Sequence, residues 1–455
     1  MTVRDDVLDD VTPDDEERRR LEDAYRRVAD RARAALDDVG VGGEVALVGS
    51  TARDTWLAGD RDIDVFLLLP PSLDRERFEE VGLDVGKAVF PDGDVDYAEH
   101  PYVAGEEDGF DVDVVPCYAV DAPADARSAV DRTPFHTAYV EERLDGDTAD
   151  EVRLLKAFVR GAGVYGSELR VRGFSGYLCE LLVLYYGDFE GVVDAAVDWR
   201  PDVVLDPGSV GGGVDAGSVG SGLEGPLIVV DPTDPDRNVA AAVSDDSFAR
   251  FVHHCREWQR AERIALFEPA TPSPLDAEGL REALGRRGTR LFAVLVETPD
   301  VVDDQLYPQL RKTRDSLVGE LDRRGFDVLR SSVLAEDRCG VLLECNVAEQ
   351  SAVERHEGPP VSVREHAESF LETYRDTDVT GPFVDDGRYV VERPREHATV
   401  RSFLASDDLL EVAIGADLAG PFEEGYEVSV DGDCAELLDD FGEAFARHFD
   451  PDLPG

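Results

Sequence analysis

The sequence predicts a multidomain α/β (α+β) fold, and three observations support this prediction. The chain has 455 residues, a length that usually corresponds to about two to four domains. Hydrophobic residues make up 42% of it, which is enough for packed cores. Helical and strand patterns alternate over residues 1–145 and again over 271–455, whereas the stretch 146–270 is mainly helical. We therefore expect three domains with these boundaries.

In the N-terminal stretch, prolines mark where the predicted elements begin and end. Thr12 and Pro13 are typical of the start of a long helix, because a capping hydroxyl precedes a proline at the first helical position. Pro70 and Pro116 each end a strand, since proline has no backbone N–H for a ladder. In order, we expect a helix from Pro13 to Gly40, a strand at Glu44–Val48, a helical turn through Arg53 and Trp56, a strand at Asp62–Leu69, a helix at Ser72–Phe90, and strands at Val95–Val103 and Phe110–Val115.

The pattern changes in the middle of the chain, where a glycine-rich segment follows a helical one. Residues 149–186 have helical periodicity. Residues 208–225 contain eight glycines but open no helix with the lysine of a phosphate-binding loop, so we expect a mobile loop or insertion. Beyond it we expect a strand at Leu227–Asp231, a helix at Ser247–Arg260, and α/β elements at Gly288–Val296, Asp304–Arg324, Phe326–Val333 and Gly340–Val347.

The charge of the chain is strongly negative, at −54, and lysine is nearly absent. Lysine occurs three times, so 43 of the 46 basic residues are arginine. An acidic, lysine-poor surface suits a protein from an extreme halophile, because molar salt screens charges within about 3 Å. In such salt the release of counterions contributes little to RNA binding. The net charge therefore does not exclude an RNA partner, and local charge has to decide.

Several protein classes are excluded by what the sequence lacks. The N-terminal residues have no basic region followed by an apolar core, and no apolar run is long enough to cross a bilayer. We expect a soluble, cytoplasmic protein without a membrane partner. The six cysteines include no CxxC pair, so we expect free thiols and neither a zinc site nor a disulfide framework.

The candidate chemistry lies in the predicted strand at Asp62–Leu69. Asp62 and Asp64 are two residues apart, so both side chains project from the same face of the strand. Asp113 lies in a second predicted strand, between two valines. Three carboxylates on neighbouring strands can hold two Mg²⁺ ions. The preceding Gly49-Ser50 turn can offer backbone N–H groups and a hydroxyl to a phosphate. The simpler alternative is a solvated acidic strand.

These motifs resemble those of a known family. GSTARDTWLAGDRDIDVF at 49–66 is similar to the signature of the polymerase-β-like nucleotidyltransferases, and more closely of the archaeal (class I) CCA-adding enzymes. Further segments resemble that family in order along nearly the whole chain: VDVVPCY at 112–118, RTPFHTAYV at 132–140, RLLKAFVRGAGVYGSELRVRGFSGYLCELLV at 153–183, VVDPTDPDRNVAAAVS at 229–244 and QLYPQLRKTRDSL at 305–317. The segments containing RGFSGYLCELL and DPxDPxRNVA are the most specific.

The resemblance implies a fold, a reaction and a set of site residues. It implies an N-terminal nucleotidyltransferase domain, a helical central domain that binds nucleotide and tRNA, and a C-terminal α/β region that binds tRNA. The implied reaction adds C, C and A to the 3′ end of tRNA from CTP and ATP, without a nucleic-acid template. By position, the matching residues are Asp62, Asp64 and Asp113 for two Mg²⁺ ions and catalysis, Ser50 and Arg53 for the triphosphate, His136, Lys156 and Tyr165 for the nucleotide, and Arg237 for the base. Asp111 has no matching role.

The sequence leaves several alternatives open. Another polymerase-β-like transferase, such as a poly(A) polymerase or an oligoadenylate synthetase, is the nearest enzymatic one. A catalytically silent RNA-binding module with the same fold is another, although it would not need the metal carboxylates. Basic residues exceed acidic ones over 151–180 and 305–325, and arginines cluster at 281–290, which favours contact with the tRNA acceptor stem. Ordinary ion pairing within helices would also explain these clusters. A homodimer is left open as the assembly state.

Overall fold

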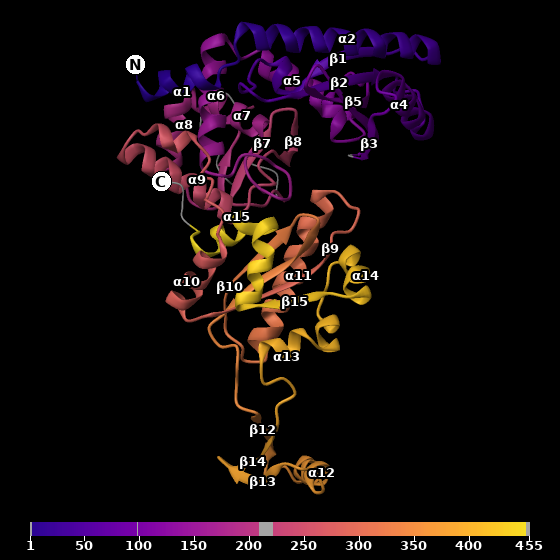
Figure 1. The fold of residues 1–455 in the computed structure, drawn as a ribbon. Coiled ribbons are helices and arrows are strands. Elements are labelled where there is room, and N and C mark those ends of the chain that lie inside the picture. Colours follow the sequence, from indigo (N-terminus) through magenta and orange to yellow (C-terminus); the bar gives the residue numbers. More distant parts are fainter. Residues whose placement is uncertain (1, 98, 209–221, 452–455) are drawn as a thin grey trace. The chain divides into compact units, whose positions relative to one another are not determined.

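The computed structural model of the chain describes residues 2–97, 99–208 and 222–451. They form two compact units, an N-terminal unit (Met1–Ala270) and a C-terminal unit (Thr271–Asp452) (Figure 1). Each unit contains both helices and sheets. Within the described residues, no helix is both long and apolar enough to cross a bilayer. All six cysteines are free and buried, which confirms the expectation of free thiols.

The N-terminal unit contains a five-stranded mixed sheet in the order β1-β2-β5-β4-β3. Its strands are β1 (Glu44–Val48), β2 (Asp62–Leu69), β3 (Asp94–Tyr97), β4 (Pro101–Glu107) and β5 (Phe110–Tyr118). Helices α2 (Asp15–Val39) and α4 (Arg75–Val89) pack on one face of this sheet (Figure 1). Strands β2 and β5 run parallel at the centre, so their residues face each other in register. The carboxylates singled out from the sequence project from the face that α2 and α4 leave uncovered.

Three local predictions for this sheet are corrected by the structure. The stretch Val95–Val103 is not one strand, because β3 ends at Tyr97 and the antiparallel strand β4 begins at Pro101. Strand β5 does not end at Pro116 but continues to Tyr118. Pro116 lies beyond the last residue pair that β5 makes with β4, and a position with a partner on one side only tolerates proline. The helical turn α3 (Gly49–Ala52) ends before Arg53 instead of running through Trp56.

The N-terminus also differs from the prediction. The long helix α2 begins after Asp14, whose side chain accepts a hydrogen bond from the Glu17 backbone N–H, so the cap is Asp14 rather than Thr12. A preceding helix, α1 (Val3–Val11), was not expected. Its capping box depends on Thr2 and Asp5, and in so acidic a segment this signal is easily missed. The long helix ends at Gly40, with φ of +72°, as predicted.

The rest of the N-terminal unit is mainly helical, with a small sheet ordered β6-β7-β8. Its elements are α5 (Thr133–Glu141), α6 (Gly146–Gly161), α7 (Gly176–Tyr186), α8 (Phe189–Ala196), α9 (Asp245–Arg260), β6 (Val203–Leu205), β7 (Leu227–Asp231) and β8 (Asp234–Asn238). An aromatic core containing Phe158, Phe251 and Trp258 joins these helices. The predicted loop at 208–225 falls largely on residues 209–221, which lie outside the described residues.

The C-terminal unit is built on an antiparallel sheet in the order β10-β11-β9-β15. Alternate residues of β9 face two separate cores, one under α11, α13 and α14 and the other under α10 and α15. A second sheet, β12-β14-β13, carries α12. The bounds are α10 (Ala277–Arg287), β9 (Arg290–Glu297), α11 (Asp303–Arg323), β10 (Val328–Ala335), β11 (Arg338–Cys345), β12 (Val353–Pro360), α12 (Arg364–Tyr374), β13 (Thr380–Asp385), β14 (Arg388–Pro394), α13 (Val400–Leu404), α14 (Ala416–Glu424), β15 (Glu427–Val430) and α15 (Leu438–Phe449).

Candidate active site

The three predicted carboxylates lie together on the uncovered face of the N-terminal sheet. Asp64 on β2 pairs in register with Asp113 on β5, and Asp62 pairs with Asp111. The alternation of β2 places Ile63 and Val65 in the core on the opposite face. The alternation and the parallel register thus place Asp62, Asp64 and Asp113 on one face of the sheet, on two adjacent strands.

These carboxylates are electrostatically uncompensated. Burial and the neighbouring charge of Asp62 raise the pKa of Asp64 to about 6, although Arg53 opposes the shift. Burial and the charge of Asp64 raise the pKa of Asp113 to about 7. Burial and the charge of Asp113 also raise the pKa of the Tyr102 hydroxyl, to about 12. A divalent cation with oxygen ligands is the partner that such a group of acids lacks.

The glycine turn after β1 packs directly against the Asp64 carboxylate. Gly49 follows β1 with φ of +77°, in the left-handed region that favours glycine. A Cβ atom there would lie 2.2 Å from Oδ2 of Asp64, so no other residue fits without moving the carboxylate. Ser50 is the next residue of the turn, and its carbonyl accepts a hydrogen bond from the Thr55 N–H. The turn and Asp64 therefore form one packed arrangement.

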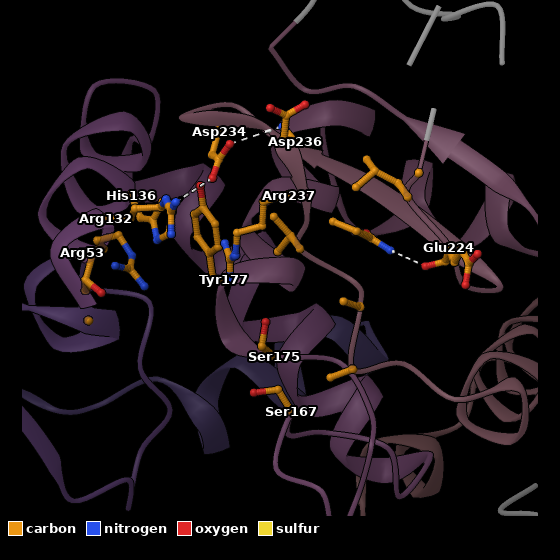
Figure 2. A pocket seen from close by; sticks show the side chains of 18 residues that line it. Arg53, Arg132, His136, Ser167, Ser175, Tyr177, Glu224, Asp234, Asp236 and Arg237 are labelled. Atoms are coloured by element: carbon orange, nitrogen blue, oxygen red, sulfur yellow. Dashed lines mark hydrogen bonds and ion pairs between the residues drawn. The ribbon is translucent and has the colours of Figure 1, made fainter. Parts of the chain in front are cut away.

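A pocket of about 860 Å³ opens beside the turn. Three predicted residues, Arg53, His136 and Arg237, line it (Figure 2). The other lining residues named in Figure 2 are Arg132, Ser167, Ser175, Tyr177, Glu224, Asp234 and Asp236. Gly49 is also part of the lining, which links the pocket to the carboxylate face. Its volume falls within the range of small-ligand sites, which is about 300–1,000 Å³.

One side of the pocket is organised by Asp231, at the end of β7. Its buried carboxylate accepts hydrogen bonds from His136 Nε2 at 2.9 Å and Arg237 Nη1 at 2.6 Å. The His136 ring stacks on Tyr177 with a centroid separation of 4.4 Å. The ion pair with Asp231 braces Arg237, yet the arginine still lines the pocket.

The other side is organised by Glu180, a fully buried carboxylate on α7. It lies 2.9 Å from Arg53 Nε and 3.4 Å from Lys156 Nζ, and it also accepts the hydroxyl of Thr55. Burial would raise the pKa of Glu180, but Arg53 and Lys156 lower it; burial lowers the pKa of Lys156. Lys156 also donates to the Thr55 carbonyl at 2.9 Å. The structure thus places Lys156 beneath the pocket wall and not on it.

One predicted residue lies off the pocket wall, and three residues of the site were missed. Tyr165 is largely buried, with its pKa raised by burial, and does not line the pocket. Tyr177 lines it instead, from the first turn of α7. Tyr177, Glu180 and Asp231 were not singled out from the sequence. The available signal was an acid inside an apolar run, as in GYLCELLVLYY and LIVVD, because a buried charge needs a partner.

The basic clusters noted in the sequence are largely paired within their own units. Arg153 contacts Asp54 and Asp150. Arg287 binds Glu344, and Arg323 and Arg324 bind Glu320. Ion pairing therefore explains much of the local excess of arginine. Among the described residues, one group of three, Glu396, His397 and Asp408, has candidate ligand atoms that all lie within 4.8 Å of one another, whereas Asp62, Asp64 and Asp113 are spread more widely. Arg324 already contacts both of its acids, so their charge is compensated.

Comparison with known proteins identifies the family. Three family models match in order along the chain: a nucleotidyltransferase domain at residues 29–136, the second domain of tRNA nucleotidyltransferase at 150–268, and the C-terminal domain of the CCA-adding enzyme at 287–431. Among solved structures, that of the Cid1 poly(U) polymerase with Mg and 3′-dATP aligns with 59% of this chain and 98% of that chain, at 16% identity and a TM-score of 0.47.

Curated relatives align over nearly the whole chain. The CCA-adding enzyme of Haloarcula marismortui is 51% identical, covering 97% of this chain and 96% of the relative. That of Halorubrum lacusprofundi is 49% identical, covering 98% and 97%. That of Halobacterium salinarum is 51% identical, covering 97% and 96%. Relatives from halophiles support the prediction of a halophilic source. The resemblance inferred from the motifs is confirmed, and the chain belongs to the CCA-adding enzyme family.

Proposed function

We propose that this protein adds cytidine, cytidine and adenosine to the 3′ end of tRNA from CTP and ATP, without a nucleic-acid template, and releases pyrophosphate. The observation that carries the proposal is that one residue, Gly49, borders both the carboxylates of β2 and β5 and the pocket. Gly49 touches Asp64 and also lines the pocket that holds Arg53, His136 and Arg237. A nucleotide in this pocket could reach the carboxylates with its phosphates. Membership of the CCA-adding enzyme family selects tRNA as the acceptor.

We assign Asp62, Asp64 and Asp113 as the ligands of two Mg²⁺ ions. The fit rests on their adjacent register and on the raised pKa values of Asp64 and Asp113, which reflect carboxylates without a compensating cation. Bound there, the two ions would supply Lewis acidity for the attacking 3′-hydroxyl and for the departing pyrophosphate. Gly49 keeps the Asp64 carboxylate in place, since its missing side chain leaves room for Oδ2.

The remaining residues bind and orient the substrates. We assign Ser50 and Arg53 to the triphosphate, and Asp113 to the proton of the attacking hydroxyl. Arg53 lines the pocket while Thr137 and Glu180 hold its guanidinium. Fixing the reacting groups in one geometry supplies much of the rate of such an in-line displacement. Lys156 and Tyr165 act from beneath the pocket wall, where Lys156 Nζ lies next to Glu180.

His136 and Arg237 are assigned to the base of the incoming nucleotide. Arginine offers five donors in a rigid fork, which can meet O2 and N3 of cytosine or N1 of adenine. Uracil carries an N3–H where cytosine has an acceptor, so a fixed donor would reject it. Arg237 reaches the pocket with one guanidinium nitrogen already held by Asp231. We propose that the C-terminal unit contributes to tRNA binding and that the reaction occurs in the cytoplasm.

Single-nucleotide incorporation distinguishes this function from its alternatives. Purified protein in high KCl with Mg²⁺ receives a tRNA that lacks CCA, together with CTP alone, ATP alone or both. We expect two additions with CTP alone, none with ATP alone, and three with both. Runs of adenosine from ATP alone would instead indicate a poly(A) polymerase. The absence of any addition, with tRNA binding intact, would indicate a silent RNA-binding module.

A further inference from the structure

The buried carboxylate of Asp231 uses its two oxygens for different tasks. Oδ1 accepts hydrogen bonds from the Thr233 backbone N–H and from the Thr233 hydroxyl, both at 2.8 Å. Oδ2 accepts from His136 Nε2 and from Arg237 Nη1. The Thr233 contacts fix the rotation of the carboxylate. Oδ2 therefore lies at a fixed point, where donors from two separate elements, α5 and β8, meet.

Both donors present their other atoms to the pocket. Because a carboxylate only accepts hydrogen bonds, the His136 Nε2 atom that faces it carries a proton. The ring stacks on Tyr177, and the hydrogen bond to Asp231 selects the orientation in which Nε2 faces the carboxylate. Among the described residues, none accepts a hydrogen bond from Arg237 Nε or Nη2. In Figure 2 His136, Tyr177 and Arg237 lie side by side along one wall.

We infer that Asp231 is a positioning residue for base selection, which holds His136 and Arg237 as one unit against the incoming base. This inference rests on the proposed function of the pocket. Without this ion pair, Arg237, whose side chain is 37% exposed, would sample many rotamers and would meet acceptors on any base. Held at Nη1, it offers donors at fixed positions, and only a base with acceptors at those positions pairs with them.

The charge state of Asp231 suits this task. Burial alone would raise the pKa of this carboxyl, but the hydrogen bond and charge of His136, with the Thr233 bonds, lower it far below its usual range. These contacts therefore favour the ionised form of the carboxyl. An uncharged amide could not replace it, because one of its two polar atoms donates. In Asp231→Asn, an amide oxygen that faces Thr233 would turn the NH₂ group toward the donors of His136 and Arg237.

The test is Asp231→Asn, read by selection between nucleotides and not by rate alone. Equilibrium binding and single-nucleotide incorporation are measured with CTP, ATP, UTP and GTP, on the protein with a tRNA that lacks CCA. Hydrogen bonds to charged groups contribute about 1.5–3 kcal/mol, so we expect the preference for CTP over UTP to fall at least about tenfold. Adding Arg237→Ala to Asp231→Asn should lower the preference for CTP over UTP by less than about a further twofold. The reason is that each substitution alone already breaks the contact between Asp231 and Arg237.

Glu344→Gln provides a matched control in the C-terminal unit. Glu344 is also a fully buried carboxylate held by an arginine, a threonine and a histidine: Arg287, Thr289 and His448. Its loss should lower the melting temperature, as Asp231→Asn does, but leave the preference for CTP over UTP unchanged. A comparable loss of preference in both variants would mean that the effect reflects general destabilisation, and the inference would be wrong.

Two further outcomes are decisive. If Asp231→Asn keeps the wild-type preference in binding and incorporation, the inference is overturned even though the proposed function stands. If the wild-type protein adds no nucleotide but binds CTP over UTP, the proposed function fails while the binding preference of Asp231→Asn still tests the inference.

If Asp231→Asn does not fold, Thr233→Val replaces it. This variant removes one hydroxyl from Oδ1 and should lower the preference about threefold; an unchanged preference overturns the inference.

Discussion

Replacement of Gly49 by alanine tests how tightly the glycine turn fixes Asp64. The added Cβ would lie 2.2 Å from Asp64 Oδ2, whereas ordinary contact begins at 3.4 Å, so the carboxylate would have to retreat by about 1.2 Å. Displacing a reacting group by about 1 Å costs roughly 100-fold in rate. The φ of +77° adds about 1–2 kcal/mol of backbone strain for alanine. We expect kcat for CTP addition to fall about 100-fold.

The control for this variant is Gly59→Ala. Gly59 also has a left-handed backbone, with φ of +84°, but nothing lies within 4 Å of the position that a Cβ atom would take there. It should lower the melting temperature by a similar amount and leave kcat nearly unchanged. The assay is single-turnover addition of labelled CTP to tRNA lacking CCA, with tRNA affinity measured in parallel. Equal kcat values for the two variants would refute the claim that Gly49 makes room for Asp64.

Three further predictions concern salt, base selection and acid stability. With a net charge of −54, the melting temperature should fall as KCl is diluted, because the Debye length grows from about 3 Å at 1 M to about 30 Å at 0.01 M; a melting temperature independent of salt would contradict this. Arg237→Ala should lose selection against UTP or GTP more than it loses triphosphate affinity. Misincorporation assays with all four nucleotides measure this selection. A variant that is slower but discriminates as well as wild type would mean that Arg237 only braces Asp231. Burial alone would raise the pKa of Glu344. Hydrogen bonds from His448, Arg287 and Thr289 instead lower this pKa from 4.5 to about 2. Because the folded pKa is the lower one, the stabilisation, of the order of 3 kcal/mol, is present above about pH 4.5 and is lost as the pH falls toward 2. The difference in unfolding free energy between wild type and Glu344→Gln should therefore shrink over that range, and a difference independent of pH would contradict the assignment.

Much of the catalytic sheet could be predicted from local sequence. The alternation in DIDVFLLL defines β2 over Asp62–Leu69, and the same alternation places Asp62 and Asp64 on one face. The parallel register of Asp64 with Asp113 could not be read from spacing, since the strands are joined through α4, β3 and β4. Asp113 could be grouped with Asp62 and Asp64 only by assuming that the two acidic strands are neighbours, and the family resemblance supported that assumption.

The pocket was predictable only in part, because its walls depend on tertiary contacts. His136 and Arg237 are 101 positions apart in the chain, and it is the burial of Asp231 between them that brings them together. Lys156 matches a nucleotide-binding position by resemblance, yet the structure buries it against Glu180. Sequence patterns report periodicity within one element, whereas these ion pairs join residues of different elements.

The most direct test of the two-metal assignment compares Asp64→Asn with Asp111→Asn. Both change one carboxylate on the same face of the same sheet, but only Asp64 is assigned as a metal ligand. Each variant is assayed for CTP and ATP addition to tRNA lacking CCA, in high KCl with Mg²⁺, and for tRNA affinity. We expect Asp64→Asn to bind the tRNA but add no nucleotide, and Asp111→Asn to complete CCA. Addition by Asp64→Asn at near the wild-type rate would contradict the two-metal assignment.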